Sequence, residues 1–191
     1  IEDVTRRLAL ADFVAFAPDA LTPVGGYQGD EDKARDMFAK LDDAKRTEDM
    51  MSSATYLKGR PECTGRIGGV GFCFGGRMVN AMAVRFPDFG GAVPFYGRQP
   101  AAADVARIKA PLQIHYASED ESINAGWPPF ETALKANGVS SIEIERVTAE
   151  PAEDEIEDSI RRLAEDNRRW QPAGAERAHD RQIVAPLFQR V

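Results

Sequence analysis

Residues 68–76 have the sequence GGVGFCFGG, in which an apolar run passes through glycines into a helical pattern. Cys73 stands at the centre of a Gly-x-Cys-x-Gly motif, with Gly71 and Gly75 two positions to either side. A turn that takes the backbone from a strand straight into a helix crowds these two positions, which glycine tolerates because it has no Cβ. The motif predicts a nucleophile elbow, with the Cys73 side chain projecting from the end of a strand.

The position of Cys73 favours nucleophilic chemistry. The predicted helix begins at Phe74, and the unpaired N–H groups and positive dipole end of a helix start favour thiolate over thiol. The backbone N–H of Phe74 would form half of an oxyanion hole for a tetrahedral acyl intermediate. Cys73 is therefore the candidate nucleophile, and Phe74 is a candidate oxyanion donor.

Other interpretations of the same turn exist. A cysteine in a glycine-rich turn is often a small, buried core residue. An activated thiolate is also oxidisable, so Cys73 is alternatively a redox-sensing thiol. Dinucleotide binding does not fit, because a Gly-x-Gly-x-x-Gly motif that starts at Gly69 and Gly71 requires a third glycine where the chain has Phe74.

Strand and helix patterns alternate on both sides of this turn, which predicts an α/β fold with a mainly parallel sheet and helices on both faces. Residues 142–147 are expected to form the last strand, and residues 151–170 a helix after it. The other strands are expected at residues 13–17, 66–72, 91–96 and 111–117, and the other helices at residues 1–8, 31–40, 50–58, 74–86 and 127–137.

Composition restricts the possible partners. The chain has 191 residues and a formal net charge of −7, from 24 Lys and Arg against 31 Asp and Glu, so a nucleic-acid partner is not expected. The sequence contains no apolar run near the ~18 residues of a membrane span, so no membrane association is expected. We expect one domain that spans residues 1–191 and acts on a small molecule.

The few cysteines and histidines indicate the compartment and the absence of a cofactor. Cys63 and Cys73 are the only cysteines, and the chain has two histidines, which leaves no clear zinc ligand set and no disulfide framework. We therefore expect a cytoplasmic protein without metal or organic cofactor. A helical pattern begins at Ile1 with no cap before it, so the domain is expected to be incomplete at its N-terminus.

Asp120 is the candidate acid of a catalytic triad. Sites in parallel sheets form where strands end, and Asp120 follows a strand end two strands after the one that precedes Cys73. A thiol nucleophile needs a base, and the base needs an acid that orients it. The order nucleophile, then acid, is that of α/β-hydrolases. The alternative is a solvated loop carboxylate between Glu119 and Glu121.

Several of these segments together resemble the dienelactone hydrolase family, the cysteine-nucleophile branch of the α/β-hydrolases. They are residues 71–76 (GFCFGG), 93–97 (VPFYG), 114–117 (IHYA) with Asp120, and 124–127 (NAGW), and the resemblance covers about residues 1–138. It implies an α/β-hydrolase fold and a Cys-His-Asp triad that opens enol-lactones or small esters through a thioester intermediate, which water then hydrolyses. Cys73 would be the nucleophile and Asp120 the triad acid.

The resemblance also identifies what this chain lacks. Family members carry the first strands of the sheet ahead of the part that matches Ile1, so we expect those strands to be missing. They place the triad histidine just after the strand that matches residues 142–147, where this chain has TAEPAED at 148–154. His115 lies in an apolar strand and is expected to be a core residue, which leaves His179 as a candidate base. The rival hypothesis is a binding or scaffold protein of the same fold that has lost the histidine.

Overall fold

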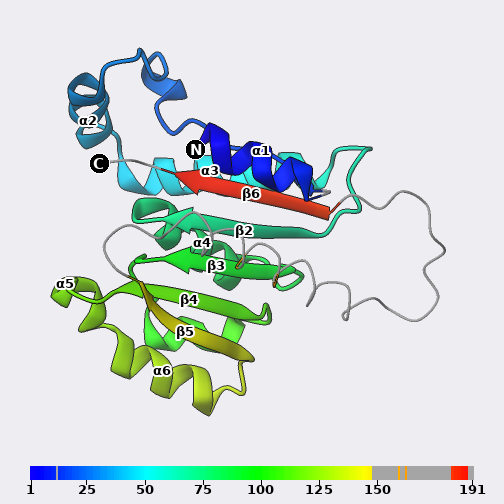
Figure 1. Ribbon diagram of the computed structural model, residues 1–191, viewed down its shortest axis with the longest axis vertical. Coiled ribbons are helices and arrows are strands. Elements are labelled where there is room, and N and C mark those ends of the chain that lie inside the picture. The colour runs from blue at the N-terminus through cyan, green and yellow to red at the C-terminus, as the bar shows by residue number, and fades with distance from the viewer. Residues whose placement is uncertain (12, 148–158, 160–161, 163–181, 189–191) are drawn as a thin grey trace.

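The described strands form one parallel sheet of six strands (Figure 1). The computed structural model describes residues 1–11, 13–147, 159, 162 and 182–188. The strand order is β1-β6-β2-β3-β4-β5, and every neighbouring pair is parallel, which confirms the predicted type of sheet. The strands are β1 (Phe13–Ala15), β2 (Ile67–Phe72), β3 (Gly91–Phe95), β4 (Leu112–Ala117), β5 (Ser141–Val147) and β6 (Gln182–Phe188).

Helices cover both faces of this sheet, as the sequence predicts. Figure 1 shows α1 in front of the sheet and α3 and α4 behind it. No helix among the described residues is long and apolar enough to cross a membrane. The helices are α1 (Glu2–Leu10), α2 (Glu31–Ala39), α3 (Asp43–Lys58), α4 (Phe74–Arg85), α5 (Glu121–Asn124) and α6 (Trp127–Ala136), with short 3₁₀ turns η1 (Thr22–Val24) and η2 (Ala102–Arg107).

Alternating strand residues divide the core into two clusters. On β3, Ala92 packs on the side of α3 and α4, and Val93 packs on the side of α1. On the α1 side, the buried rings of Phe72, Phe95 and His115 stack across three neighbouring strands, with ring centroids 4.5 and 4.2 Å apart. These three residues are also register partners, so the stack aligns β2, β3 and β4 and places their carboxyl ends side by side.

His115 is a buried core residue, which confirms the prediction for it. Its Nε2 lies 3.1 Å from the Gln113 amide nitrogen and 3.1 Å from the Ser159 hydroxyl. Burial, together with the positive charge of Arg162, lowers the pKa of His115 to about 4. The imidazole is therefore neutral at pH 7 and belongs to the core instead of to the edge where the strands end.

Strand β6 corrects the expectation that residues 142–147 form the last strand. It lies between β1 and β2, and Pro186 pairs in register with Val70 in the interior of the sheet. Proline cannot donate a ladder hydrogen bond and argues against a central strand, which explains why the apolar run 183–188 did not predict one. The helix predicted over residues 151–170 lies, except for residues 159 and 162, outside the described part of the chain.

The neutral state of buried His115 predicts a pH-dependent stability. An unfolded histidine titrates near 6.5, so the unfolded chain binds this proton first as the pH falls, and the folded state loses stability between pH 7 and pH 4. His115→Gln should remove about 3 kcal/mol of that loss, measured as the free energy of urea unfolding at each pH. Parallel pH curves for wild type and variant would contradict this account.

Candidate active site

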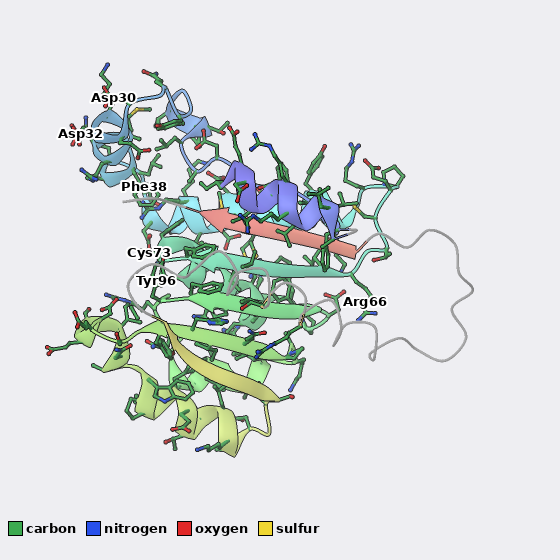
Figure 2. All side chains as sticks on the ribbon, in the orientation of Figure 1. Asp30, Asp32, Phe38, Arg66, Cys73 and Tyr96 are labelled. Atoms are coloured by element: carbon green, nitrogen blue, oxygen red, sulfur yellow. The ribbon has the colours of Figure 1, made fainter. Side chains whose placement is uncertain are left out.

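Cys73 occupies a strained turn between β2 and α4. Its φ of 53° and ψ of −114° lie in a region that residues with a Cβ rarely adopt. The Cys73 N–H donates to the Phe95 carbonyl at 3.0 Å, and the Cys73 carbonyl accepts from the Arg77 N–H at 3.1 Å. The side chain is exposed at the sheet edge beside Tyr96 (Figure 2), so the interpretation as a buried core cysteine is wrong.

Glycines allow the backbone segments around this turn to approach closely. A Cβ on Gly71 would overlap the carbonyl group of Gly75, which confirms the predicted crowding of the motif. A Cβ on Gly76 would lie 2.7 Å from the Phe95 oxygen, and one on Gly97 would overlap the Gly76 carbonyl carbon. The start of α4 is therefore packed against the end of β3, backbone to backbone.

The start of α4 supplies the N–H groups expected of an oxyanion hole. The first turn of a helix has N–H groups without intrahelical acceptors, and no side chain in the described part of the chain caps those of α4. Phe74 is the first residue of this helix and directly follows Cys73. Its N–H is thus available one residue from the exposed sulfur.

Asp120 lies at the same edge of the sheet, after β4. It is the N-cap of α5, and its Oδ1 accepts a hydrogen bond of 3.0 Å from the Ile123 N–H. Asn124 holds the same turn through a 2.8 Å bond from its amide to the Ala117 carbonyl. Because β2, β3 and β4 are neighbours, Tyr96 at the end of β3 stands between the strand ends that lead to Cys73 and Asp120.

A pocket of about 650 Å³ opens at this edge. Its lining consists of Tyr96 and residues 117–122, and therefore includes Asp120. Tyr96 has a φ of 39°. Among the described non-glycine residues, only Cys73 and Tyr96 have a positive φ. Strained backbone at two adjacent strand ends beside a pocket is typical of a functional site.

Gln99 connects two of the segments at this edge, a role that the sequence did not indicate. Its side-chain amide donates to the Tyr116 hydroxyl at 2.8 Å and to the Ile123 carbonyl at 3.0 Å. These bonds tie the loop after β3 to β4 and to the helix that Asp120 caps. Burial raises the pKa of Tyr116 to about 12, so its hydroxyl stays protonated at this contact.

The structure also bears on possible metal ligands and on the two histidines. Among the described residues, no group of three or more His, Cys, Asp and Glu side chains is arranged to hold a metal ion. His115 is buried in the core and is not part of this edge. His179, the candidate base, lies outside the described residues.

With this geometry in place, comparison with known proteins identifies the family. A model described as the dienelactone hydrolase family matches residues 1–146. The chain belongs to the dienelactone hydrolase family. The match reaches residue 146, beyond the limit near residue 138 that the motifs suggest, and includes all of β5 except its last residue.

Relatives and solved structures agree with this assignment. A protein of Aquifex aeolicus named "Putative carboxymethylenebutenolidase" is 33% identical over 135 residues, which cover 65% of this chain and 55% of that protein. The chain thus spans about half the length of the curated relatives that it matches first.

Two solved structures show the α/β-hydrolase fold in this chain. The dienelactone hydrolase of Anabaena variabilis has a TM-score of 0.52 and 15% identity, and the match covers 80% of this chain and 82% of that one. A "Putative Dienelactone Hydrolase" of Klebsiella pneumoniae has a TM-score of 0.56 and 19% identity, with 75% and 69% coverage. The predicted fold class is confirmed.

The close packing at Gly97 predicts that one added methyl group strongly lowers the free energy of unfolding. Gly97→Ala should lower the free energy of unfolding by more than about 2 kcal/mol, because the new Cβ meets backbone atoms that cannot move aside. Gly59→Ala is the matched control, since its Cβ would lie 3.7 Å from the nearest backbone oxygens. Urea unfolding of both variants checks this, and equal stabilities would contradict the proposed packing of α4 on β3.

Proposed function

We propose that this chain carries the catalytic centre of a hydrolase for small esters or enol-lactones, with Cys73 as the nucleophile. The observation that carries the proposal is the exposed Cys73 side chain on a turn with a positive φ at the start of a helix. Such a turn is costly for a residue with a Cβ and persists where function requires the side chain to project. Membership of the dienelactone hydrolase family supports the same chemistry.

The proposed reaction proceeds through a thioester. The thiolate of Cys73 attacks the carbonyl carbon, and the carbonyl π electrons move to oxygen, where the Phe74 N–H stabilises the negative charge. The intermediate then collapses, the C–O bond breaks, and the alcohol or enol leaves with a proton. Water attacks the thioester in a second step of the same kind and releases the carboxylic acid and the thiol.

Proton transfer requires a base, for which the proposed partner is a histidine oriented by Asp120. Buried, neutral His115 is excluded from that role by its place in the core. His179 remains the candidate. Oδ1 of Asp120 accepts a hydrogen bond from the Ile123 N–H. We therefore propose that Oδ2, the second oxygen, orients the base.

The proposed substrate is a small molecule, because the pocket of about 650 Å³ beside Asp120 has the size of an ordinary small-ligand site. We also propose that the protein acts in the cytoplasm. A reducing compartment keeps an exposed thiol such as Cys73 in the reduced form that attack on a carbonyl requires.

A burst experiment tests this function. Purified protein mixed with p-nitrophenyl acetate should release about one equivalent of p-nitrophenol rapidly and gain one acetyl group on Cys73, detected by peptide mass. Cys73→Ala should abolish the burst. Cys63→Ala should retain it, because Cys63 is half-buried and burial raises the pKa of its thiol.

The two ways in which this experiment fails have different meanings. A burst of equal size in Cys73→Ala would remove Cys73 from the mechanism. No burst in the wild-type protein would favour the alternative of a scaffold or binding protein with an α/β-hydrolase fold.

A further inference from the structure

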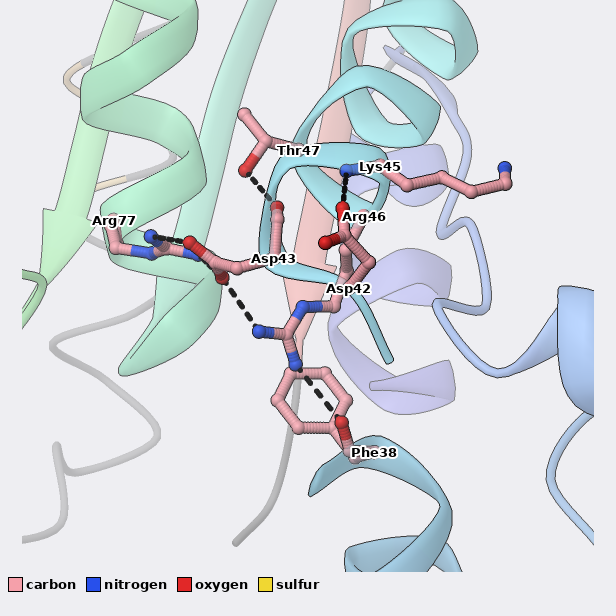
Figure 3. A network of polar contacts seen from close by, with 7 residues as sticks. All are labelled: Phe38, Asp42, Asp43, Lys45, Arg46, Thr47 and Arg77. Atoms are coloured by element: carbon pink, nitrogen blue, oxygen red, sulfur yellow. Dashed lines mark hydrogen bonds and ion pairs between the residues drawn. The ribbon is translucent and has the colours of Figure 1, made fainter. Parts of the chain in front are cut away.

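Side chains from three helices contact Phe74. Figure 3 shows how Phe38, Asp43, Arg46 and Arg77 lie relative to one another. The Phe74 ring receives the ring of Phe38 edge-on, with centroids 5.0 Å apart and an interplanar angle of 83°. The guanidinium carbons of Arg46 and Arg77 lie 4.9 and 5.0 Å from the centre of the same ring. Phe74 thus has an aromatic neighbour from α2, a cation from α3 and a cation from its own helix.

Asp43 holds both guanidinium groups in place. Arg77 donates to the two carboxylate oxygens of Asp43 at 2.9 and 2.5 Å, which is a bidentate pair. Arg46 donates to Oδ1 of Asp43 at 2.6 Å and to the Phe38 carbonyl at 3.2 Å, and its guanidinium lies 3.9 Å from the Phe38 ring centre. These contacts connect the end of α2, the start of α3 and the start of α4.

Asp43 is ionised at neutral pH. The hydrogen bonds from Arg77, and then those from Arg46, lower the pKa of Asp43 to about 2. Asp43 itself is 57% exposed, whereas the Arg46 side chain is only 11% exposed. The carboxylate thus orients an almost fully covered cation against two aromatic rings.

The contacts of the Phe74 ring matter because the backbone N–H of Phe74 is the proposed oxyanion donor. The φ of 53° at Cys73 is strained, and a strained conformation persists only when its surroundings hold it from several sides. The peptide between Cys73 and Phe74 contains the Phe74 N–H. Fixing the Phe74 ring also fixes its Cα, and therefore limits rotation of that peptide.

We propose that Phe38, Asp43, Arg46 and Arg77, here named the Phe74 clamp, position the backbone N–H of Phe74 toward the oxyanion of the acyl intermediate. The four side chains are positioning residues, since they act through Phe74 and not on the substrate. This inference rests on the proposed function.

Two reactions of Cys73 separate this role from a general effect on folding or thiol reactivity. Acylation by p-nitrophenyl acetate passes through an oxyanion, whereas alkylation by iodoacetamide is a displacement at saturated carbon and develops no oxyanion. A misplaced Phe74 N–H therefore slows acylation and leaves alkylation unchanged. Peptide mass after alkylation also shows whether half-buried Cys63 has become reactive, which reports unfolding.

The test variants are Arg77→Met and Asp43→Asn, and the matched control is Arg85→Met. Arg85 is on the same helix, is 61% exposed and lies 4.0 Å from Glu48, so its loss removes the same charge without touching Phe74. Acylation should slow about tenfold or more in both test variants, with alkylation within about twofold of the wild type. Arg85→Met should change neither rate.

Each of the other outcomes contradicts a specific part of the proposal. Unchanged acylation in both test variants, while the wild type is acylated, contradicts the clamp and leaves the proposed function standing. An equal loss of both rates shows an effect on the sulfur or on folding instead of on the oxyanion donor. Absence of acylation in the wild type contradicts the proposed function and, with it, the role of the clamp.

Discussion

The site depends on a backbone that turns from β2 into α4 with no room for side chains at the flanking positions. Gly71 and Gly75 meet in that turn, and Cys73 at its apex accepts a positive φ of 53°. The strained turn is held by the hydrogen bond from the Cys73 N–H to β3, by the bond from the Arg77 N–H to the Cys73 carbonyl, and by the backbone packing of Gly76 against the end of β3. That turn positions the side chain of Cys73 and the start of α4.

The sheet places the turn at Cys73 beside the other residues of the candidate site. Stacked rings on β2, β3 and β4 fix the register of three neighbouring strands, so their ends present Cys73, Tyr96 and the Asp120 loop in order. Polar contacts then hold each loop: Gln99 ties two of them together on one side of the turn. The Phe74 clamp lies on the other side, where α2 and α3 approach α4.

Local patterns predicted much of this structure, because they depend on residues close in sequence. The elbow glycines and the buried strand around His115 follow from neighbours within a few positions. The contact of Asp43 with Arg77 joins residues 34 positions apart and depends on the angle between two helices, which no local pattern encodes. Strand β6 was missed because Pro186 contradicts the usual rule for central strands.

A crystal structure of the protein treated with a trifluoromethyl ketone would test the central claim most directly. Such ketones add to a thiolate and give a hemithioketal whose oxygen mimics the oxyanion of acyl transfer. The account predicts a bond from Cys73 Sγ to the ketone carbon, a positive φ at Cys73, and the adduct oxygen within hydrogen-bond distance of the Phe74 N–H. An unmodified Cys73, or an adduct whose oxygen points away from Phe74, would contradict it.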